Sequence, residues 1–364
     1  MNILLDNIIF SLQKAGGASV VWQQHLERLL KDKVFQCRFL EYDNAKLNLF
    51  RQQLSINKEL IDLKSSKFML LKRYQNLNSK NEEKHLFHSS HYRLEEGKNA
   101  INVTTVHDFT YEHYRSGTPQ KIHSWQKYKA INGSEGVICI SNSTKDDLIK
   151  FLPNFDKNKI RVIYNGVDEG FKLLDSNLNF DKKHSFEDYQ YALYVGDRRS
   201  THKNFNMAVD ACYLSNIPLL LIGGGVLNEI EKQMLDSKLG KSNYQCITGV
   251  SVEDLNYFYN RAFCLLYPSL YEGFGIPIIE AQRAGCPVIA TKSSSIPEVL
   301  GNSYLALENP TSEKISKRVK ELASTSDLRK ESIEIGYEKA KQFSWQNTYH
   351  QTTEFYKELY LRNR

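Results

Sequence analysis

The sequence predicts an α/β protein of two doubly wound domains, each with a parallel sheet of the Rossmann-like type, that face a deep cleft. Length is one observation behind this prediction, because 364 residues are too many for one ordinary core and suit two domains of roughly 150 to 200 residues. The other is a pattern in which short apolar runs alternate with helical stretches. Such alternation is typical of parallel strands covered by helices on both faces, and it occurs twice along the chain.

The first domain is expected to span residues 1–168 and to begin with an apolar strand, a glycine turn and a helix. The strand covers Ile3–Leu5 and could continue to Phe10, and the turn is Gly16-Gly17-Ala18. This order forms the opening unit of a Rossmann-like sheet. Ser141 is placed to cap a helix that starts near Thr144. Further strands are expected at residues 84–89, 100–106 and 136–140.

An interdomain linker is expected at residues 169–188, because this stretch has no clear period and is rich in charged residues, Asn and Ser. The second domain then covers residues 189–345, and residues 346–364 form a final helix. The second half repeats the plan of the first. Its strands are expected at residues 191–195, 218–222, 244–248, 264–267 and 287–291, with helices from 204, after 225, near 252–262 and near 276–284.

The composition indicates a soluble protein. Hydrophobic residues make up 41% of the chain and charged residues 25%, and no apolar run reaches the 18 residues that suggest a membrane span. The first residues lack a basic leader and a cleavage site, which predicts a cytoplasmic location. The six cysteines are scattered without a CxxC pair, so buried reduced thiols are expected rather than disulfides or zinc ligands.

Positive charge is concentrated in the first half. Residues 1–170 contain 25 Lys and Arg against 19 Asp and Glu, whereas residues 171–364 contain 23 of each, so the net charge of +6 is entirely N-terminal. Residues 51–84 carry eight basic and four acidic side chains around the apolar run Phe68–Leu71. This mixture favours a surface helix that rests on anionic lipid, with a solvated helix as the alternative. Nucleic acid is not expected as a partner, because the excess is modest and no recognition motif accompanies it.

The loop after the expected strand at 264–267 carries the clearest functional pattern. Ligands of open parallel sheets bind at the carboxyl ends of the strands, where this loop lies. Glycines let a ligand approach the backbone, Pro277 suits a first helical turn, and free N–H groups at a helix start attract phosphate. The loop reads Tyr271-Glu272-Gly273-Phe274-Gly275-Ile276-Pro277-Ile278-Ile279-Glu280.

Glu-x7-Glu with EGFG inside it, after a strand in the second of two Rossmann-like halves, resembles the retaining glycosyltransferase family 4 of the GT-B fold. The resemblance extends over most of the chain. It implies that Glu272 contacts the donor sugar and that Glu280 hydrogen-bonds the nucleotide ribose, which suits a carboxylate. Gly273, Phe274 and Gly275 are implied to give backbone contacts to sugar or phosphate. The final helix is implied to cross back to the first domain.

A second loop follows the first strand of the second domain. A diphosphate leaving group gains negative charge as the glycosidic bond breaks, and an Arg with a Lys at a helix start can stabilise it. The resemblance implies this role for Arg198 and Lys203, and the spacing leaves open whether Arg199 replaces Arg198. The loop reads Val195-Gly196-Asp197-Arg198-Arg199-Ser200-Thr201-His202-Lys203-Asn204.

Two positions in the first domain complete the predicted site. His107 and Asp108 follow an apolar run, and in the family a histidine in this HD context faces the donor sugar. We therefore expect His107 to contact a sugar hydroxyl more than to act as a general base. Gly17 lies in the turn that the family places beside the diphosphate or the acceptor. The same turn argues against a dinucleotide site, because GxGxxG and its acidic partner are absent.

The resemblance implies an enzyme of bacterial surface polysaccharide synthesis. It would move a sugar from a nucleoside-diphosphate sugar, with retention, to a hydroxyl of a glycan or lipid-linked acceptor. The departing phosphate would help to deprotonate the acceptor in a front-face substitution, while the protein supplies positioning and electrostatics. Residues 51–84 would contact the inner face of the membrane.

No Asp-x-Asp occurs in the sequence, so we expect neither a metal nor another cofactor. The alternatives are a sugar-nucleotide epimerase or phosphorylase-like enzyme, a nicotinamide-dependent oxidoreductase, and a non-catalytic nucleotide-sugar-binding module. The oxidoreductase would need the missing glycine fingerprint.

Overall fold

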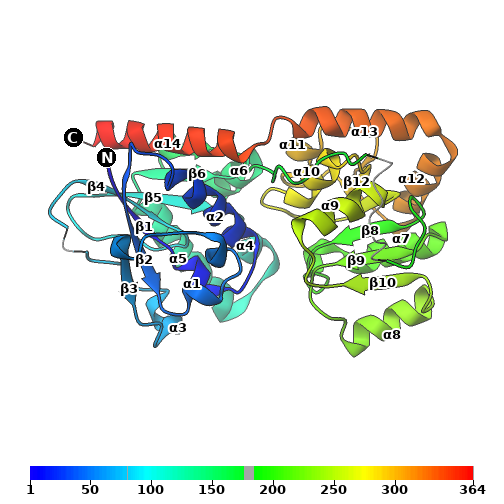
Figure 1. Ribbon diagram of the computed structural model, residues 1–364, viewed down its shortest axis with the longest axis horizontal. Helices are drawn as coiled ribbons and strands as arrows, with labels where there is room; N and C mark the ends of the chain where they lie inside the picture. Colours follow the sequence, from blue (N-terminus) through cyan, green and yellow to red (C-terminus); the bar gives the residue numbers. More distant parts are fainter. Residues whose placement is uncertain (80, 176–183, 364) are drawn as a thin grey trace. The chain divides into compact units, whose positions relative to one another are not determined.

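Two parallel sheets organise the chain, one in each of two units (Figure 1). The computed structural model describes residues 1–79, 81–175 and 184–363. The first unit contains Met1–Gly166 together with the segment from Trp345 to the C-terminus, and the second contains Val167–Ser344. Every pair of neighbouring strands in both sheets is parallel, which confirms the predicted fold class of two doubly wound domains.

The sheet of the first unit has seven strands in the order β3-β2-β1-β4-β5-β6-β7. The strand order therefore reverses between β1 and β4, and the carboxyl ends of these two strands form the switch point of the sheet. The strands are β1 Asn2–Asp6, β2 Gln36–Tyr42, β3 Ile61–Lys64, β4 His85–Ser89, β5 Ala100–Val106, β6 Gly136–Cys139 and β7 Ile160–Val162.

Helices connect these strands, and two of them, Gly17–Leu29 and Asn142–Phe151, fall where the sequence predicts a helix. The Ser141 hydroxyl accepts a hydrogen bond from the Thr144 backbone N–H at 3.0 Å, which confirms the predicted cap. The predicted extension of the first strand to Phe10 is wrong, because the buried Asn7 bonds Glu41 and Trp22 through its side chain and the chain then turns. The helices are α1 Ile9–Leu12, α2 Gly17–Leu29, α3 Met69–Lys72, α4 Thr110–Tyr114, α5 Gly117–Asn132 and α6 Asn142–Phe151.

The sheet of the second unit has six strands in the order β10-β9-β8-β11-β12-β13, with its switch point between β8 and β11. The strands are β8 Ala192–Val195, β9 Leu219–Ile222, β10 Tyr244–Ile247, β11 Cys264–Tyr267, β12 Val288–Thr291 and β13 Ala306–Leu307. The helices are α7 Phe205–Ser215, α8 Glu229–Lys238, α9 Val252–Arg261, α10 Ile276–Arg283, α11 Ile296–Leu300, α12 Ser312–Ser324 and α13 Ser326–Ala340.

The final helix α14, Trp345–Arg362, packs within the first unit, where Figure 1 shows it in red. Its buried Tyr356 bonds two imidazoles through the hydroxyl, at 2.5 Å from His88 Nδ1 and 3.0 Å from His25 Nε2. Burial lowers the pKa of His25 to about 4, with a further contribution from Arg28, and lowers that of His88 well below its ordinary value. Both imidazoles are therefore neutral at pH 7, which suits a buried anchor for the helix.

The structure adds detail to two predicted segments. In the expected linker at residues 169–188, the backbone N–H groups of Lys172 and Leu174 donate to the side chains of Asn256 and Asn260 on α9. Residues 176–183 of that prediction lie outside the described residues. The surface helix expected around Phe68–Leu71 is only the single turn α3, because β3 takes the residues before it into the sheet.

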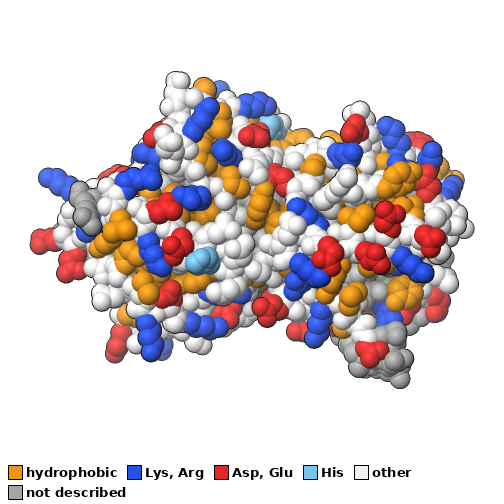
Figure 2. Space-filling model, turned by 90° about the horizontal axis from the view of Figure 1, so that it is seen from above, with side chains coloured by type: hydrophobic (Ala, Val, Ile, Leu, Met, Phe, Trp, Pro, Cys, Tyr) orange, Lys and Arg blue, Asp and Glu red, His pale blue; other side chains and the backbone are white. Residues whose placement is uncertain are grey.

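Three features can be compared with the sequence predictions: the distribution of charge on the surface, the presence of membrane-spanning helices and the state of the cysteines. On the face shown in Figure 2, basic and acidic side chains are interspersed, so the N-terminal excess of positive charge forms no continuous patch there. In the described part of the chain, no helix is long and apolar enough to cross a membrane. All six cysteines are free, and four of them are buried, as predicted.

Candidate active site

The loops after β8 and β11 meet at the switch point of the second sheet. Asn204 Nδ2 donates to the Pro268 carbonyl at 3.0 Å, and the Leu270 N–H donates to the His202 carbonyl at 2.7 Å. Lys203 therefore lies opposite the Glu272 loop, and its Nζ is 2.7 and 2.9 Å from the two carboxylate oxygens of Glu272. The structure thus brings together two of the residues that the sequence predicts for the donor site.

The lysine and glutamate of this pair remain partly exposed. The Lys203 side chain keeps 21% of its surface and Glu272 keeps 11%, so both can be reached from solvent. An opposite charge at this distance in a partly desolvated site is held strongly, and a bound anion would compete for the ammonium. The pair can therefore exchange one anionic partner of Lys203, the carboxylate, for another, such as a diphosphate.

A serine-rich turn after β12 fixes the backbone of the Glu272 loop. The buried Ser295 hydroxyl is 2.8 Å from the Glu272 carbonyl and 2.9 Å from the Phe274 carbonyl. Phe274 is itself buried and packs edge-on against Phe343 at 5.6 Å between ring centroids. Any donor contact of Phe274 is therefore made by its backbone.

Gly275 lets the loop turn directly into α10. Its φ of 107° is a conformation that residues with a Cβ rarely adopt, and an added Cβ would lie 3.2 Å from the Ile278 side chain and 3.4 Å from that of Val299. Pro277 occupies the first turn of the helix, as the sequence predicts. The N–H groups that open α10 consequently face the carboxyl end of β11.

Glu280 lies farther along α10, where its Oε2 accepts a hydrogen bond from the Tyr259 hydroxyl at 3.0 Å. Burial raises the pKa of this carboxyl to about 7, the Tyr259 hydrogen bond lowers it, and Asp168 raises it further. A carboxyl that titrates near neutral pH is characteristic of functional sites, although structural groups can share the property. Glu280 is thus held in one orientation by Tyr259, with a charge that depends on pH near 7.

Both candidate arginines contact the glycine loop after β9. The buried Arg198 guanidinium donates to the carbonyls of Gly223 and Gly225 and pairs with Glu231 at 3.2 Å. Arg199 donates to the Gly224 carbonyl at 3.0 Å and to the same glutamate at 2.9 Å. In this structure the two residues hold that loop against β8, and their diphosphate role stays a prediction.

The first unit has a comparable junction at its own switch point. Arg93 binds Asp6 through two hydrogen bonds of 2.6 and 2.8 Å, and the Ser89 hydroxyl donates to the same carboxylate at 2.7 Å. All three side chains are buried, so they fix the carboxyl ends of β1 and β4 together. The sequence analysis missed this pair, because neither residue belongs to a motif, although an aspartate ending the first apolar strand was a visible signal.

His107 follows β5, and a buried lysine fixes the residue after it. Lys127 Nζ donates to the Asp108 carbonyl and to Glu112, both at 2.8 Å. Burial lowers the pKa of His107, Lys127 lowers it further, and Asp108 opposes the change. Burial would raise the pKa of Asp108, but Lys127 and the Thr110 hydrogen bonds lower it overall. A neutral imidazole beside an ionised carboxylate can donate to or accept from a sugar hydroxyl.

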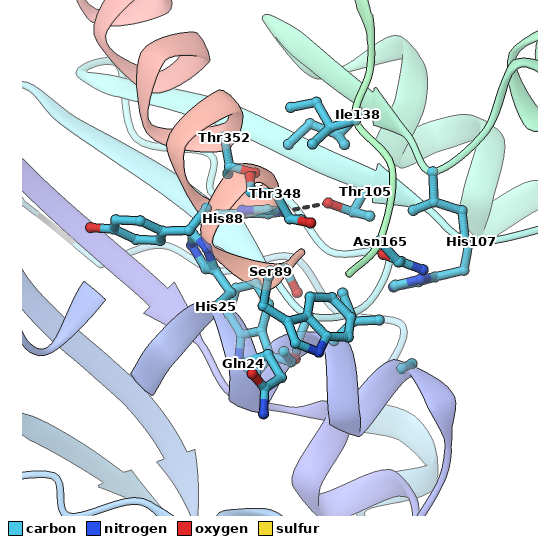
Figure 3. A pocket seen from close by; sticks show the side chains of 18 residues that line it. Gln24, His25, His88, Ser89, Thr105, His107, Ile138, Asn165, Thr348 and Thr352 are labelled. Carbon is cyan, nitrogen blue, oxygen red and sulfur yellow. Dashed lines mark hydrogen bonds between the residues drawn. The ribbon is translucent and has the colours of Figure 1, made fainter. Parts of the chain in front are cut away.

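A mostly apolar pocket lies between His107 and the start of α14 (Figure 3). His88 Nε2 is 2.9 Å from the Thr105 hydroxyl on one wall, and Thr348 and Thr352 of α14 line another. Asn165 lies near His107 in the close view. The helix α14 thus completes a pocket whose remaining walls come from α2, the ends of β4, β5 and β6, and the residues that follow β7.

Gly17 is the first residue of α2 and is exposed. An added Cβ there would meet nothing within 4 Å, so the position leaves open space beside the helix start. The donor-side residues Lys203, Glu272 and Glu280 belong to the second unit, whereas Gly17 and His107 belong to the first. Two all-parallel Rossmann-like units with polar side chains at the switch points define the GT-B class of architecture.

Comparison with known families agrees with this class. The family described as Glycosyl transferases group 1 matches residues 175–339, and Glycosyltransferase Family 4 matches residues 81–171. The chain therefore belongs to the family 4 glycosyltransferases, as the Glu272–Glu280 motif predicts.

Curated relatives and solved structures extend the likeness. O-antigen chain mannosyltransferase B of Escherichia coli is 27% identical over 71% of this chain and 70% of its own length. O-antigen chain mannosyltransferase RfbU of Salmonella typhimurium is 30% identical over 58% of this chain and 57% of its own length.

The fold itself is shared with more distant proteins. Sucrose-phosphate synthase from Thermosynechococcus elongatus superposes with a TM-score of 0.74 at 16% identity, with all of both chains covered. Anabaena HepE in complex with UDP and glucose gives 0.72 at 15% identity, covering 98% of this chain and 100% of HepE.

Proposed function

We propose that this protein transfers a mannosyl residue from a nucleoside-diphosphate mannose to a hydroxyl of a glycan or lipid-linked acceptor, in the synthesis of a bacterial surface polysaccharide. The observation that carries the proposal is the Lys203–Glu272 pair at the β8/β11 switch point. Two O-antigen mannosyltransferases among the relatives support the choice of sugar, and the UDP held by HepE supports a nucleotide donor.

The proposed reaction is a substitution with retention in which the departing phosphate takes the proton of the acceptor hydroxyl. Lys203 would hold the charge that develops on the diphosphate, and Glu272 would turn to the donor sugar once its lysine has this new partner. Glu280 would accept a hydrogen bond from the ribose. Positioning and electrostatics supply the catalysis in this proposal, and no metal is part of it.

A thermal-shift screen of UDP, GDP, ADP and CMP with their sugars, in EDTA, tests the donor site. We expect one nucleoside diphosphate to raise the melting temperature, because a ligand of the folded state alone stabilises it. Lys203→Ala and Glu280→Ala should each abolish that shift. The matching nucleotide mannose, incubated with a lipid-linked glycan, should give a product whose anomeric configuration by NMR equals that of the donor. Binding that survives both substitutions, or an inverted product, would contradict the proposal.

We further propose that α3 and the strand before it contact the anionic inner face of the membrane. The side chains of Leu63, Phe68, Leu70 and Leu71 are 62 to 80% exposed, an unusual density of apolar surface for one short segment. Lys67 lies 5.3 Å from the Phe68 ring centroid, so charge and apolar surface are adjacent. This arrangement is what an interfacial anchor requires.

Co-sedimentation with vesicles of phosphatidylglycerol and phosphatidylcholine tests this contact. We expect binding that falls as salt rises, since about 1 kcal/mol per basic residue comes from the anionic surface. The triple variant Lys64→Gln, Lys67→Gln, Lys72→Gln should lose most of the binding, and Leu70→Ser should weaken it. Lys31→Gln is the control, because Lys31 is exposed just after the end of α2 and belongs to neither β3 nor α3. Equal binding by the triple variant and the control would refute the contact.

A further inference from the structure

A group of basic side chains lies beside His107 in the first unit but plays no part in the reaction described above. Arg73, which follows α3, has Nη2 3.2 Å from His91 Nε2 in the loop after β4. The His91 ring is 6.5 Å from the His123 ring of α5, measured between centroids. His123 in turn stacks on Tyr111 at 3.9 Å. Three segments far apart in sequence therefore bring an arginine and two imidazoles together.

The backbone around this group is held from both sides. Arg93 Nη1 donates to the Lys72 carbonyl at 3.3 Å while the rest of its guanidinium binds Asp6. Gln126 of α5 donates to the Tyr92 carbonyl at 3.0 Å and to the Arg73 carbonyl. The positions of the basic side chains are thus set by buried polar contacts and not by surface loops alone.

Two buried nitrogen atoms in the group lack hydrogen-bond partners. Among the described residues, no carboxylate lies within 4.0 Å of the Arg73 guanidinium, and its buried Nε makes no hydrogen bond. His123 Nδ1 is likewise buried without a partner. The nearby carboxylates are engaged elsewhere, with Asp6 on Arg93 and Glu112 on Lys127. Buried polar nitrogens without partners are costly. An anion would accept a hydrogen bond from Arg73 Nε–H, and also from His123 Nδ1 once that nitrogen carries a proton.

Burial, reinforced by the surrounding charges, keeps both imidazoles neutral. Burial lowers the pKa of His91 well below its ordinary value, and Arg73, His123, Arg93 and His107 lower it further. Burial lowers the pKa of His123 to about 4, Lys127 and Arg73 lower it further, and Glu112 and Asp108 oppose the change. An anion among these groups would raise both pKa values, because it favours the protonated imidazoles.

We propose that Arg73, His91 and His123 bind a phosphate group of the acceptor, beside His107. His91 Nε2 now lies against the Arg73 guanidinium as an acceptor. If a phosphate oxygen accepted the hydrogen bond of Arg73 instead, His91 Nε2 would be free to gain a proton and to donate a hydrogen bond to the phosphate. The exposed Phe68, Leu70 and Leu71 immediately before Arg73 supply apolar surface for a chain attached to that phosphate. The ligand class is therefore a lipid-linked phosphate or diphosphate.

This inference rests on the acceptor class of the proposed function, yet binding can be measured without any transfer. We suggest titration calorimetry with geranyl diphosphate, inorganic pyrophosphate and geraniol. The titrations use the full chain carrying Lys203→Met, so that the predicted donor site does not contribute. If the protein showed no transferase activity, the proposed function would fail, but these titrations would still show whether the phosphate site exists.

We expect geranyl diphosphate to bind more tightly than pyrophosphate, and geraniol not to bind. Arg73→Gln and His123→Gln should each weaken binding of geranyl diphosphate at least tenfold. Arg115→Gln, an exposed arginine just after α4, should leave it unchanged. Binding should be tighter at pH 6 than at pH 8 and should take up protons, as seen in buffers of different ionisation enthalpy. Equal affinity of the Arg73 and His123 variants and the control, or binding of pyrophosphate alone, would overturn the proposal.

Discussion

Lys203→Met is expected to reduce kcat/KM for mannosyl transfer by about 10²–10³-fold, the typical effect of removing one preorganised group that stabilises a developing negative charge. The lysine has no second ammonium beside it in the switch-point loops, where its bonds of 2.7 and 2.9 Å go to Glu272. Steady-state rates with the matching nucleotide mannose measure the effect. A circular dichroism melt should show that the variant still folds.

The control for this experiment is Lys292→Met. Lys292 forms an ion pair with Glu308 at 3.5 Å in the same unit, and both side chains are at least 44% exposed. Exposed pairs of this kind contribute little, so neither rate nor melting temperature should change much. Adding Glu272→Gln to Lys203→Met should slow transfer far less than the sum of the two single effects, because the pair acts as one unit. A Lys203→Met rate within threefold of wild type would remove this residue from the mechanism.

Glu280→Gln is expected to make the protein more stable than wild type at pH 8 to 9, on the order of 2–3 kcal/mol in the free energy of unfolding. The pKa of Glu280 is raised, chiefly by burial, from 4.5 to about 7. Its contribution to stability is therefore fully present below pH 4.5 and is lost as the pH rises through about 7. Glutamine keeps the uncharged shape and can still accept from Tyr259, so its contribution does not depend on pH.

Urea unfolding of the full chain, followed by far-ultraviolet circular dichroism at several pH values, measures this difference. The two proteins should differ by less than about 1 kcal/mol at pH 5, because Glu280 is protonated in the folded state there and the pH is only slightly above the ordinary pKa of 4.5 that applies to the unfolded state. Glu253→Gln, at an exposed position in the first turn of α9, is the matched control and should change stability little at any pH. A stability difference independent of pH would mean that Glu280 does not titrate in this range.

Lys203→Met and Glu280→Gln also separate effects on stability from effects on function. If Glu280 accepts a hydrogen bond from the donor ribose, Glu280→Gln should bind nucleotide more weakly even where it is the more stable protein. Higher stability together with weaker binding is expected where a buried group lowers the stability of the fold but is needed to bind the ligand. Lys203→Met should weaken nucleotide binding without the gain in stability.

Much of the second unit follows from the sequence alone. Its strands at β8, β9 and β11 and its helices α9 and α10 lie within one or two residues of the predicted ranges. Fully buried parallel strands appear in the sequence as short apolar runs, and Gly and Pro mark their ends. The local sequence is therefore sufficient to predict where these strands lie. The strands β2 and β3, which lie on one side of the first sheet, were missed, because their sequences mix charged and apolar residues.

The sequence by itself determined the fold class, the family and the residues of the donor loops, because motifs and apolar periods are local properties. Only the tertiary structure decided which of these residues meet. It pairs Lys203 with Glu272, 69 positions apart, and buries Arg198 under a glycine loop that belongs to another strand. It also raises the pKa of Glu280 and gathers Arg73, His91 and His123 around one point. Strand order decides which loops meet, and burial decides the pKa values. Both are properties of the folded chain, so neither strand order nor burial follows from a local stretch of sequence.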